Sequence, residues 1–188
     1  PDTLLAKHFF TPADAGSYAG VATTARVLVY ASTALASFLF PVVARGHGDG
    51  EHGHARLVSH AVLGLVVFVN VVLLTVCYVQ PDLVLRLVVG SQYEAVGSLL
   101  GPLALALSAY AVLSVLITYL LATATRLFWV PLLAAPCAET VLILLHHQTL
   151  LDFIHSIDIV MLVTLAIVAY IYCLPTRQAP SLVQEWEE

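Results

Sequence analysis

The stretch VGSLLGPLALALSAYAVLSVLITYLLA, residues 96–122, contains no charged side chain and decides the fold class. A helix needs about 20 predominantly apolar residues to cross the hydrocarbon layer of a bilayer, and this stretch is long enough. Similar stretches recur along the chain. Of all its residues, 60% are hydrophobic and only 10% are charged. A soluble domain of 188 residues could not bury so much apolar surface. We therefore expect an all-α, polytopic bundle of transmembrane helices.

Short polar segments divide the apolar stretches into five expected full crossings. These crossings are about 16–44, 57–79, 96–122, 127–145 and 157–174. The breaks between them contain proline, glycine or charged residues, which commonly end helices, and lie at 11–15, 45–56, 80–82, 125–126 and 146–156. We expect residues 1–10 to be the last turns of a helix whose beginning is missing, which would make the chain a fragment. Residues 1–175 would then form one transmembrane lobe, and 176–188 a solvated tail.

The basic residues predict the orientation of this lobe in the membrane. Because successive crossings alternate in direction, the breaks at 45–56 and 125–126 and the tail share one side. The basic residues on that side are Arg45, Arg56, Arg126 and Arg177, whereas the other side has Lys7 and Arg86. Positive charge is enriched in cytoplasmic loops, so we expect the C-terminus to be cytoplasmic.

The segment 81–97 predicts a short helix that lies in the outer membrane interface. Pro81 and Asp82 are residues that begin helices, and a short amphipathic run follows them. Gly90 then predicts a turn, after which the chain enters the next crossing. An amphipathic helix of this kind typically lies in the plane of the interface.

Arg26 is the most informative charged residue inside an expected crossing. It lies about ten residues into the first crossing, or about 15 Å below its outer end. An arginine at the centre of a membrane helix costs about 2.5–3.5 kcal/mol on insertion scales, so it usually faces a partner or a watery cavity. At helical spacing it belongs to a polar stripe formed by Thr23, Arg26, Tyr30, Thr33 and Ser37. This polar stripe could bind an anionic group. The alternatives are a structural ion pair, for example with Glu139, and snorkelling toward an interface.

Glu139 is the only acidic residue that we place deep within a crossing. It follows Pro131 and Pro136, which we expect to kink or loosen the fourth crossing. A carboxyl group there could relay protons or coordinate a coupling cation. Alternatively, it could pair with Arg26 or form a hydrogen bond to a neighbouring helix as an uncharged acid.

No pattern in the sequence predicts a catalytic centre, a cofactor or a nucleic-acid surface, so we do not expect an enzyme. The chain has no phosphate-binding glycine loop, no nucleophile elbow and no His-Glu-x-x-His motif. The glycine-rich segment 45–56 contains His47, His52 and His54, which are potential metal ligands. We interpret it as a solvated cytoplasmic linker and predict no metal site.

Several short motifs resemble one transporter family in their order and spacing. The motifs AGSYAG at 15–20, ARV at 25–27 and FP at 40–41 resemble the eighth helix of polysaccharide and lipid-linked oligosaccharide exporters. These exporters belong to the multidrug/oligosaccharidyl-lipid/polysaccharide exporter superfamily. The stretch LRLVVGSQYEAVG at 85–97 resembles the family's outer-interface element before the tenth helix, and PDTLL at 1–5 resembles its seventh helix. The resemblance covers nearly the whole chain.

This resemblance implies a transporter with two pseudo-symmetric lobes that work by alternating access around a central cavity. The chain would be the C-terminal lobe, and the missing N-terminal lobe would belong to the same chain or to a second subunit. The implied partners are membrane lipid and a lipid-linked saccharide, a precursor of polysaccharide or lipopolysaccharide. The implied location is the bacterial inner (plasma) membrane. Related flippases use cavity arginines to bind the anionic head of their substrate, and this role corresponds here to Arg26.

Two other functions remain open at this point. A cation-coupled multidrug exporter of the same superfamily would need acidic residues in the cavity and would tolerate the loss of Arg26. A membrane scaffold that transports nothing would have polar stripes facing lipid and no internal cavity.

Overall fold

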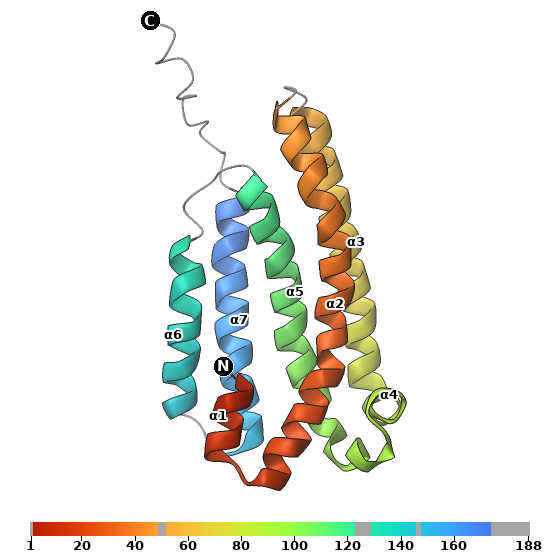
Figure 1. The fold of residues 1–188 in the computed structure, drawn as a ribbon, viewed down its shortest axis with the longest axis vertical. Helices are drawn as coiled ribbons and strands as arrows, with labels where there is room; N and C mark the ends of the chain where they lie inside the picture. Colours follow the sequence, from red (N-terminus) through yellow and green to blue (C-terminus); the bar gives the residue numbers. More distant parts are fainter. Residues whose placement is uncertain (1, 49–51, 123–128, 146–147, 174–188) are drawn as a thin grey trace, which may run out of the picture.

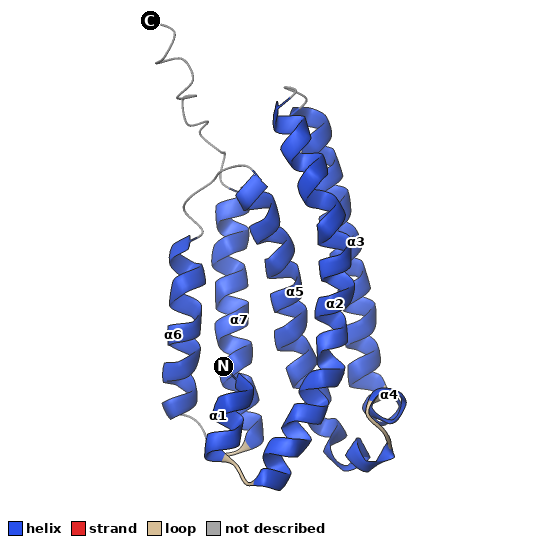
Figure 2. Cartoon of the chain, viewed as in Figure 1, coloured by secondary structure: helices blue, strands red, loops and turns tan. Residues whose placement is uncertain are grey.

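The described part of the chain is helical throughout and contains no strand (Figure 2). The computed structural model describes residues 2–48, 52–122, 129–145 and 148–173. The helices are α1 (Asp2–Phe9), α2 (Pro12–Gly48), α3 (His52–Val79), α4 (Pro81–Val88), the 3₁₀-helix η1 (Ser91–Leu99), α5 (Leu100–Ala122), α6 (Trp129–Leu145) and α7 (Leu150–Cys173). The predicted all-helical fold class is therefore confirmed.

The long helices lie alongside one another in a bundle, and α5 is at its centre (Figure 1). Helix α5 contacts α2 on one side and α7 on the other. Helix α3 packs against α2, and α6 packs against α7. The short helices α1 and α4 lie at the lower end of the bundle, and α1 contacts α2 (Figure 1).

Three of the described helices are long and apolar enough to cross a membrane. The apolar spans are His60–Val79, Val96–Leu121 and Leu150–Cys173, and they coincide with the second, third and fifth expected crossings. Helix α6 is apolar but has only 17 residues, and α2 contains Arg26 within its length. The crossings expected at 16–44 and 127–145 therefore remain predictions, whereas the membrane-compatible character of the bundle is established.

Helix α7 begins earlier than the sequence indicated. The expected break covered 146–156, but the helix begins at Leu150 because Thr149 caps it. The Thr149 hydroxyl oxygen accepts a hydrogen bond from the Asp152 backbone N–H at 3.1 Å, and the hydroxyl donates to Asp152 Oδ2 at 2.8 Å. A threonine cap satisfies a backbone donor that the first helical turn would otherwise leave unpaired. The helix that contains the fifth expected crossing therefore begins seven residues before residue 157, and the bounds of the crossing remain a prediction.

Helix α2 begins at Pro12, inside the break that was expected at 11–15. Thr11 and Asp14 form the same pair of hydrogen bonds. The Thr11 hydroxyl oxygen accepts from the Asp14 backbone N–H at 3.3 Å, and the hydroxyl donates to Asp14 Oδ2 at 2.7 Å. Proline is well suited to the first position of a helix, because its missing N–H would have no partner there. The predicted loop is therefore a helix start.

The break expected at 45–56 is also shorter than predicted. Helix α2 continues to Gly48 and α3 begins at His52, so only residues 49–51, which lie outside the described residues, separate them. Each helical glycine costs about 1 kcal/mol relative to alanine, but packing of α2 against α3 favours the helix. The break at 125–126 and the tail 176–188 lie outside the described residues.

Small residues allow α2 and α5 to approach each other closely. Ala22 and Ala25 of α2 belong to the same buried cluster as Ala104 and Ala106 of α5. Small side chains at helix contacts are typical of membrane proteins, where packing rather than the hydrophobic effect joins the helices. The buried face of α2 therefore includes these two alanines beside Tyr18, Val21 and Thr24.

The predicted interface element at 81–97 is confirmed as a short helix followed by a turn. Leu85 on α4 is fully buried, whereas Leu87 is exposed. Gly90 has a positive φ of 104°, a backbone angle that residues with a side chain rarely adopt. The 3₁₀-helix η1 follows it. The Tyr93 ring of η1 packs against Gly20 of α2, where an added Cβ atom would collide with it. The location of this element in a membrane interface remains a prediction.

Candidate functional site

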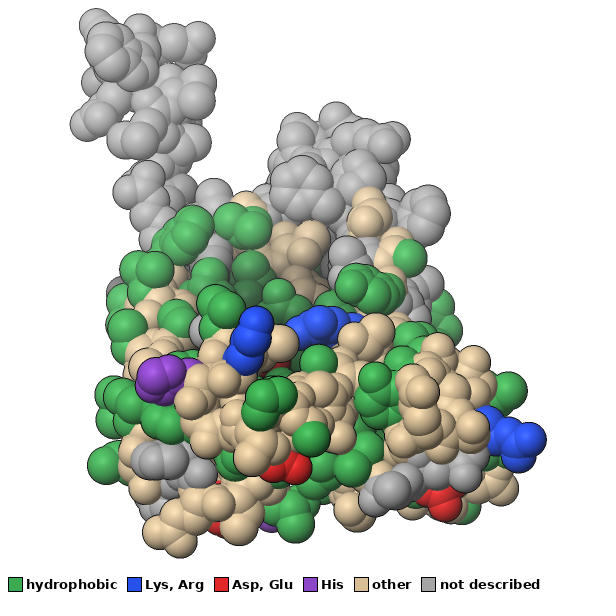
Figure 3. All heavy atoms as spheres, turned by 60° about the horizontal axis from the view of Figure 1, so that its bottom comes forward, with side chains coloured by type: hydrophobic (Ala, Val, Ile, Leu, Met, Phe, Trp, Pro, Cys, Tyr) green, Lys and Arg blue, Asp and Glu red, His purple; other side chains and the backbone are tan. Residues whose placement is uncertain are grey.

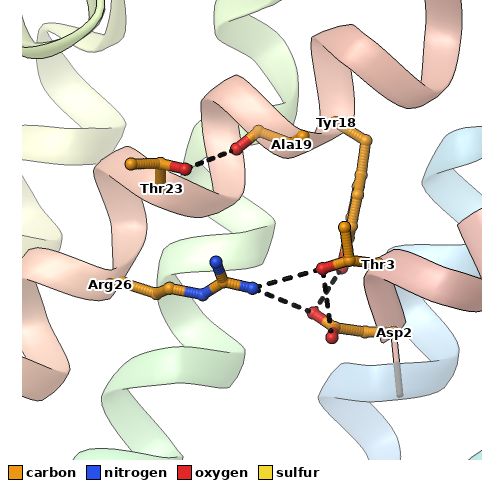
Figure 4. Close-up of polar contacts among 6 residues, drawn as sticks. All are labelled: Asp2, Thr3, Tyr18, Ala19, Thr23 and Arg26. Atoms are coloured by element: carbon orange, nitrogen blue, oxygen red, sulfur yellow. Dashed lines mark hydrogen bonds and ion pairs between the residues drawn. The ribbon is translucent and has the colours of Figure 1, made fainter.

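Arg26 of α2 points toward α1 and contacts two of its residues (Figure 4). Its Nη2 donates a hydrogen bond to Thr3 Oγ1 at 3.2 Å and lies 3.9 Å from Asp2 Oδ2. The ion pair that we considered between Arg26 and Glu139 is not formed in the described part of the chain. The sequence offered Glu139 as a partner because it did not show that α1 packs against α2 and brings Asp2 to the level of Arg26.

Tyr18 connects this contact to the core of the bundle. Its hydroxyl donates a hydrogen bond to Asp2 Oδ2 at 3.0 Å, and its side chain is fully buried. The Tyr18 ring makes an edge-to-face contact with Phe153 of α7, with ring centroids 5.3 Å apart. Residues of α1, α2 and α7 therefore meet here. We call Asp2, Thr3, Tyr18 and Arg26 the Arg26 node.

The Arg26 guanidinium is only partly used by these contacts. A guanidinium has five N–H donors, and both contacts to α1 involve Nη2. The Nε–H and Nη1–H donors have no partner among the described residues, and Figure 4 shows one guanidinium nitrogen turned away from α1. The Arg26 side chain is 39% exposed. Its unused donors are therefore accessible to an anion.

Charged side chains reach the surface at the lower end of the bundle. Figure 3 shows basic side chains that reach the surface on the face of the bundle where its lower end comes forward. Lys7 of α1 is among the exposed basic residues. Acidic side chains also reach this face, so it carries charges of both signs (Figure 3).

The other members of the polar stripe face away from the buried side of α2. Thr23 is exposed and donates its hydroxyl to the Ala19 carbonyl of its own helix at 2.8 Å (Figure 4). Tyr30 is 67% exposed, and Ser37 is also exposed. The side chain of Thr33 lies outside the described residues. The described part of the stripe therefore lies on the surface of this bundle. A cavity could form there only if another protein segment covered the stripe.

Glu139 lies near the Arg26 node but on a different helix. Its side chain is only 5% exposed, and it is within electrostatic reach of Asp2. Helix α6 continues through Pro136, and the Thr140 hydroxyl donates to the Pro136 carbonyl at 2.8 Å. The burial of Glu139 agrees with the sequence analysis, whereas its suggested role in coupling remains a prediction.

Asp158 is a buried acid that the sequence analysis missed, so the view that Glu139 is the only deep acid is wrong. Asp158 is 6% exposed, and its Oδ1 has no hydrogen-bond partner in the described ranges. Because α7 begins at Leu150, Asp158 lies about 12 Å along the helix from its first residue and not at its N-terminal end. The signal that could have found it is the Thr149–Asp152 cap, which fixes where the helix starts.

The three histidines of the glycine-rich segment cannot be assigned a site. The side chains of His47, His52 and His54 lie outside the described residues. Among the side chains that the structure describes, no group of three or more His, Cys, Asp or Glu residues could hold a metal ion.

No protein-family model, curated protein or solved structure matches the chain.

Proposed function

We propose that the chain is the C-terminal lobe of a flippase or exporter that moves lipid-linked oligosaccharide or polysaccharide precursors across a membrane. The observation that carries this proposal is the state of Arg26, which is part-exposed and has unused N–H donors. An arginine placed among apolar helices is costly unless it serves a ligand or a partner. Its partner Asp2 uses only one of the guanidinium nitrogens.

The chemistry of Arg26 suits a diphosphate or another acidic headgroup. A planar guanidinium forms charge-assisted hydrogen bonds to phosphate oxygens, and these are stronger than hydrogen bonds between neutral groups. The exposed hydroxyl of Tyr30 lies farther along the same stripe and could contact the saccharide. Thr23 contributes less, because its hydroxyl is bonded to its own helix.

The outward direction of the polar stripe fits a lobe that a second lobe covers, although a scaffold with its stripe facing lipid would share this feature. In a two-lobe transporter the substrate site lies between the repeats, so each lobe presents a polar surface to the other. The stripe of α2 would be such a surface, and the N-terminal lobe, in the same chain or in a second subunit, would cover it. The proposed location is the bacterial inner membrane with a cytoplasmic C-terminus, which rests on the distribution of basic residues.

A cation-coupled multidrug exporter is the second candidate, and two buried acids favour it. Glu139 and Asp158 are both nearly inaccessible in the described bundle. Ionisable residues inside membrane proteins often belong to ion or proton pathways. This function would require one of these carboxyl groups and would not require Arg26.

The test of the proposal is translocation by the intact protein in proteoliposomes. A fluorescent prenyl-diphosphate saccharide is placed in both leaflets, and dithionite destroys the fluorophores that are outside. We expect Arg26→Ala to abolish translocation and Arg86→Ala, which removes an exposed arginine of α4, to preserve it. Full translocation by Arg26→Ala would refute the proposal. Cation-driven transport of an organic dye that requires Glu139 or Asp158 and not Arg26 would support the multidrug exporter.

A further inference from the structure

We propose that Asp2 is an internal competitor for Arg26, which an anionic headgroup displaces when it binds. This inference rests on the proposed function, because it concerns the regulation of the same anion site. It predicts that ligand binding and the contact between Asp2 and Arg26 exclude each other.

Asp2 acts on Arg26 through its charge rather than by orienting it. The distance of 3.9 Å between Asp2 Oδ2 and Arg26 Nη2 is too long for a hydrogen bond, whereas Thr3 accepts one at 3.2 Å. The hydrogen bond that Asp2 Oδ2 accepts comes from Tyr18. Removing the negative charge of Asp2 should therefore leave Arg26 held by Thr3 and strengthen its attraction for an external anion.

The packing of α1 allows Asp2 to leave Arg26 without exposing the core. Ala6 is fully buried, and the Phe10 ring contacts Phe153 edge-to-face at 5.7 Å. These contacts hold α1 at the end where it joins α2. The turn that contains Asp2 makes the polar contacts of the Arg26 node, and its Leu4 side chain is 76% exposed, whereas Leu5 packs against the core. Displacement of Asp2 would break its contact with Arg26, which the ligand replaces, and the hydrogen bond from Tyr18, which the ligand does not replace.

The competition has a measurable size. The side chains of Arg26 and Asp2 are 39% and 27% exposed, so solvent screens their attraction. Exposed ion pairs contribute up to about 1 kcal/mol, which corresponds to about fivefold in an equilibrium constant.

The first experiment measures binding of a prenyl diphosphate to the full 188-residue chain in lipid nanodiscs. We expect Asp2→Asn to lower Kd about fivefold, on the order of one exposed ion pair. The matched control is Asp14→Asn, which removes an exposed acid from the first turn of α2 and retains a side-chain oxygen that can accept the Thr11 hydrogen bond. An unchanged or weaker affinity in Asp2→Asn would overturn the competition. Equal binding by Arg26→Gln and the unchanged chain would instead overturn the proposed function.

The second experiment detects the displacement without changing the Arg26 node. A nitroxide is attached to Leu4→Cys after Cys77, Cys137 and Cys173 are replaced by alanine. We expect saturating prenyl diphosphate to increase the mobility of the label, and the uncharged prenyl alcohol to have no effect. A spectrum that stays the same when prenyl diphosphate saturates the chain would contradict the displacement of Asp2.

Discussion

Tyr18→Phe tests how strongly the Arg26 node ties α1 to the bundle. The change removes the hydroxyl that donates to Asp2 Oδ2 at 3.0 Å and retains the ring that packs against Phe153. A hydrogen bond to a charged group contributes about 1.5–3 kcal/mol to stability. Asp2 is 27% exposed, so water can partly replace the lost donor. We therefore expect the free energy of unfolding to fall by about 1.5 kcal/mol, the lower end of that range.

The measurement is reversible unfolding in mixed micelles with increasing SDS, followed by circular dichroism. Tyr30→Phe is the matched control, because Tyr30 lies on the same helix and is 67% exposed. It should change the unfolding free energy by less than about 0.5 kcal/mol. The double mutant with Asp2→Asn should show a coupling of about 1 kcal/mol between the two sites. Equal effects of Tyr18→Phe and Tyr30→Phe, together with no coupling, would refute this description of the node.

Three further changes test other parts of the structure by the same unfolding measurement. Thr149→Ala removes the cap of α7 and should cost about 1 kcal/mol, whereas Thr149→Asn should cost little; equal costs would contradict the cap. Gly90→Ala forces a side chain into a φ of 104° and should cost about 1–3 kcal/mol. Gly64→Ala, in open space on α3, should stabilise the chain by about 0.5–1 kcal/mol, and a loss in both variants would argue against backbone strain at Gly90.

Hydrophobicity alone was sufficient to predict the helical class and the three apolar spans. A stretch such as 96–122 has no stable alternative in a bilayer, because only a helix pairs all its backbone groups within the segment. The element at 81–97 could also be predicted, since proline, an amphipathic run and Gly90 each act locally. Local signals of this kind need no knowledge of tertiary contacts.

Helix starts and the partners of charged residues were harder to predict. Polar residues such as Thr11 and Thr149 resemble a loop in composition, although each caps a helix through the aspartate three positions later. The partner of Arg26 comes from α1, and nothing in the sequence spacing relates Asp2 to residue 26. The wrong start of α7 also concealed the burial of Asp158. These features depend on how the helices pack.

The most direct test of the central claim is equilibrium binding of a prenyl diphosphate to the 188-residue chain in nanodiscs. If Arg26 binds the anionic headgroup, the diphosphate binds saturably, and prenyl alcohol binds much more weakly. Arg26→Gln should then raise Kd by about 10–100-fold, the equivalent of a charged hydrogen bond, and Arg86→Gln should leave it unchanged. Equal Kd values for the unchanged chain and Arg26→Gln, or equal binding of diphosphate and alcohol, would contradict the claim.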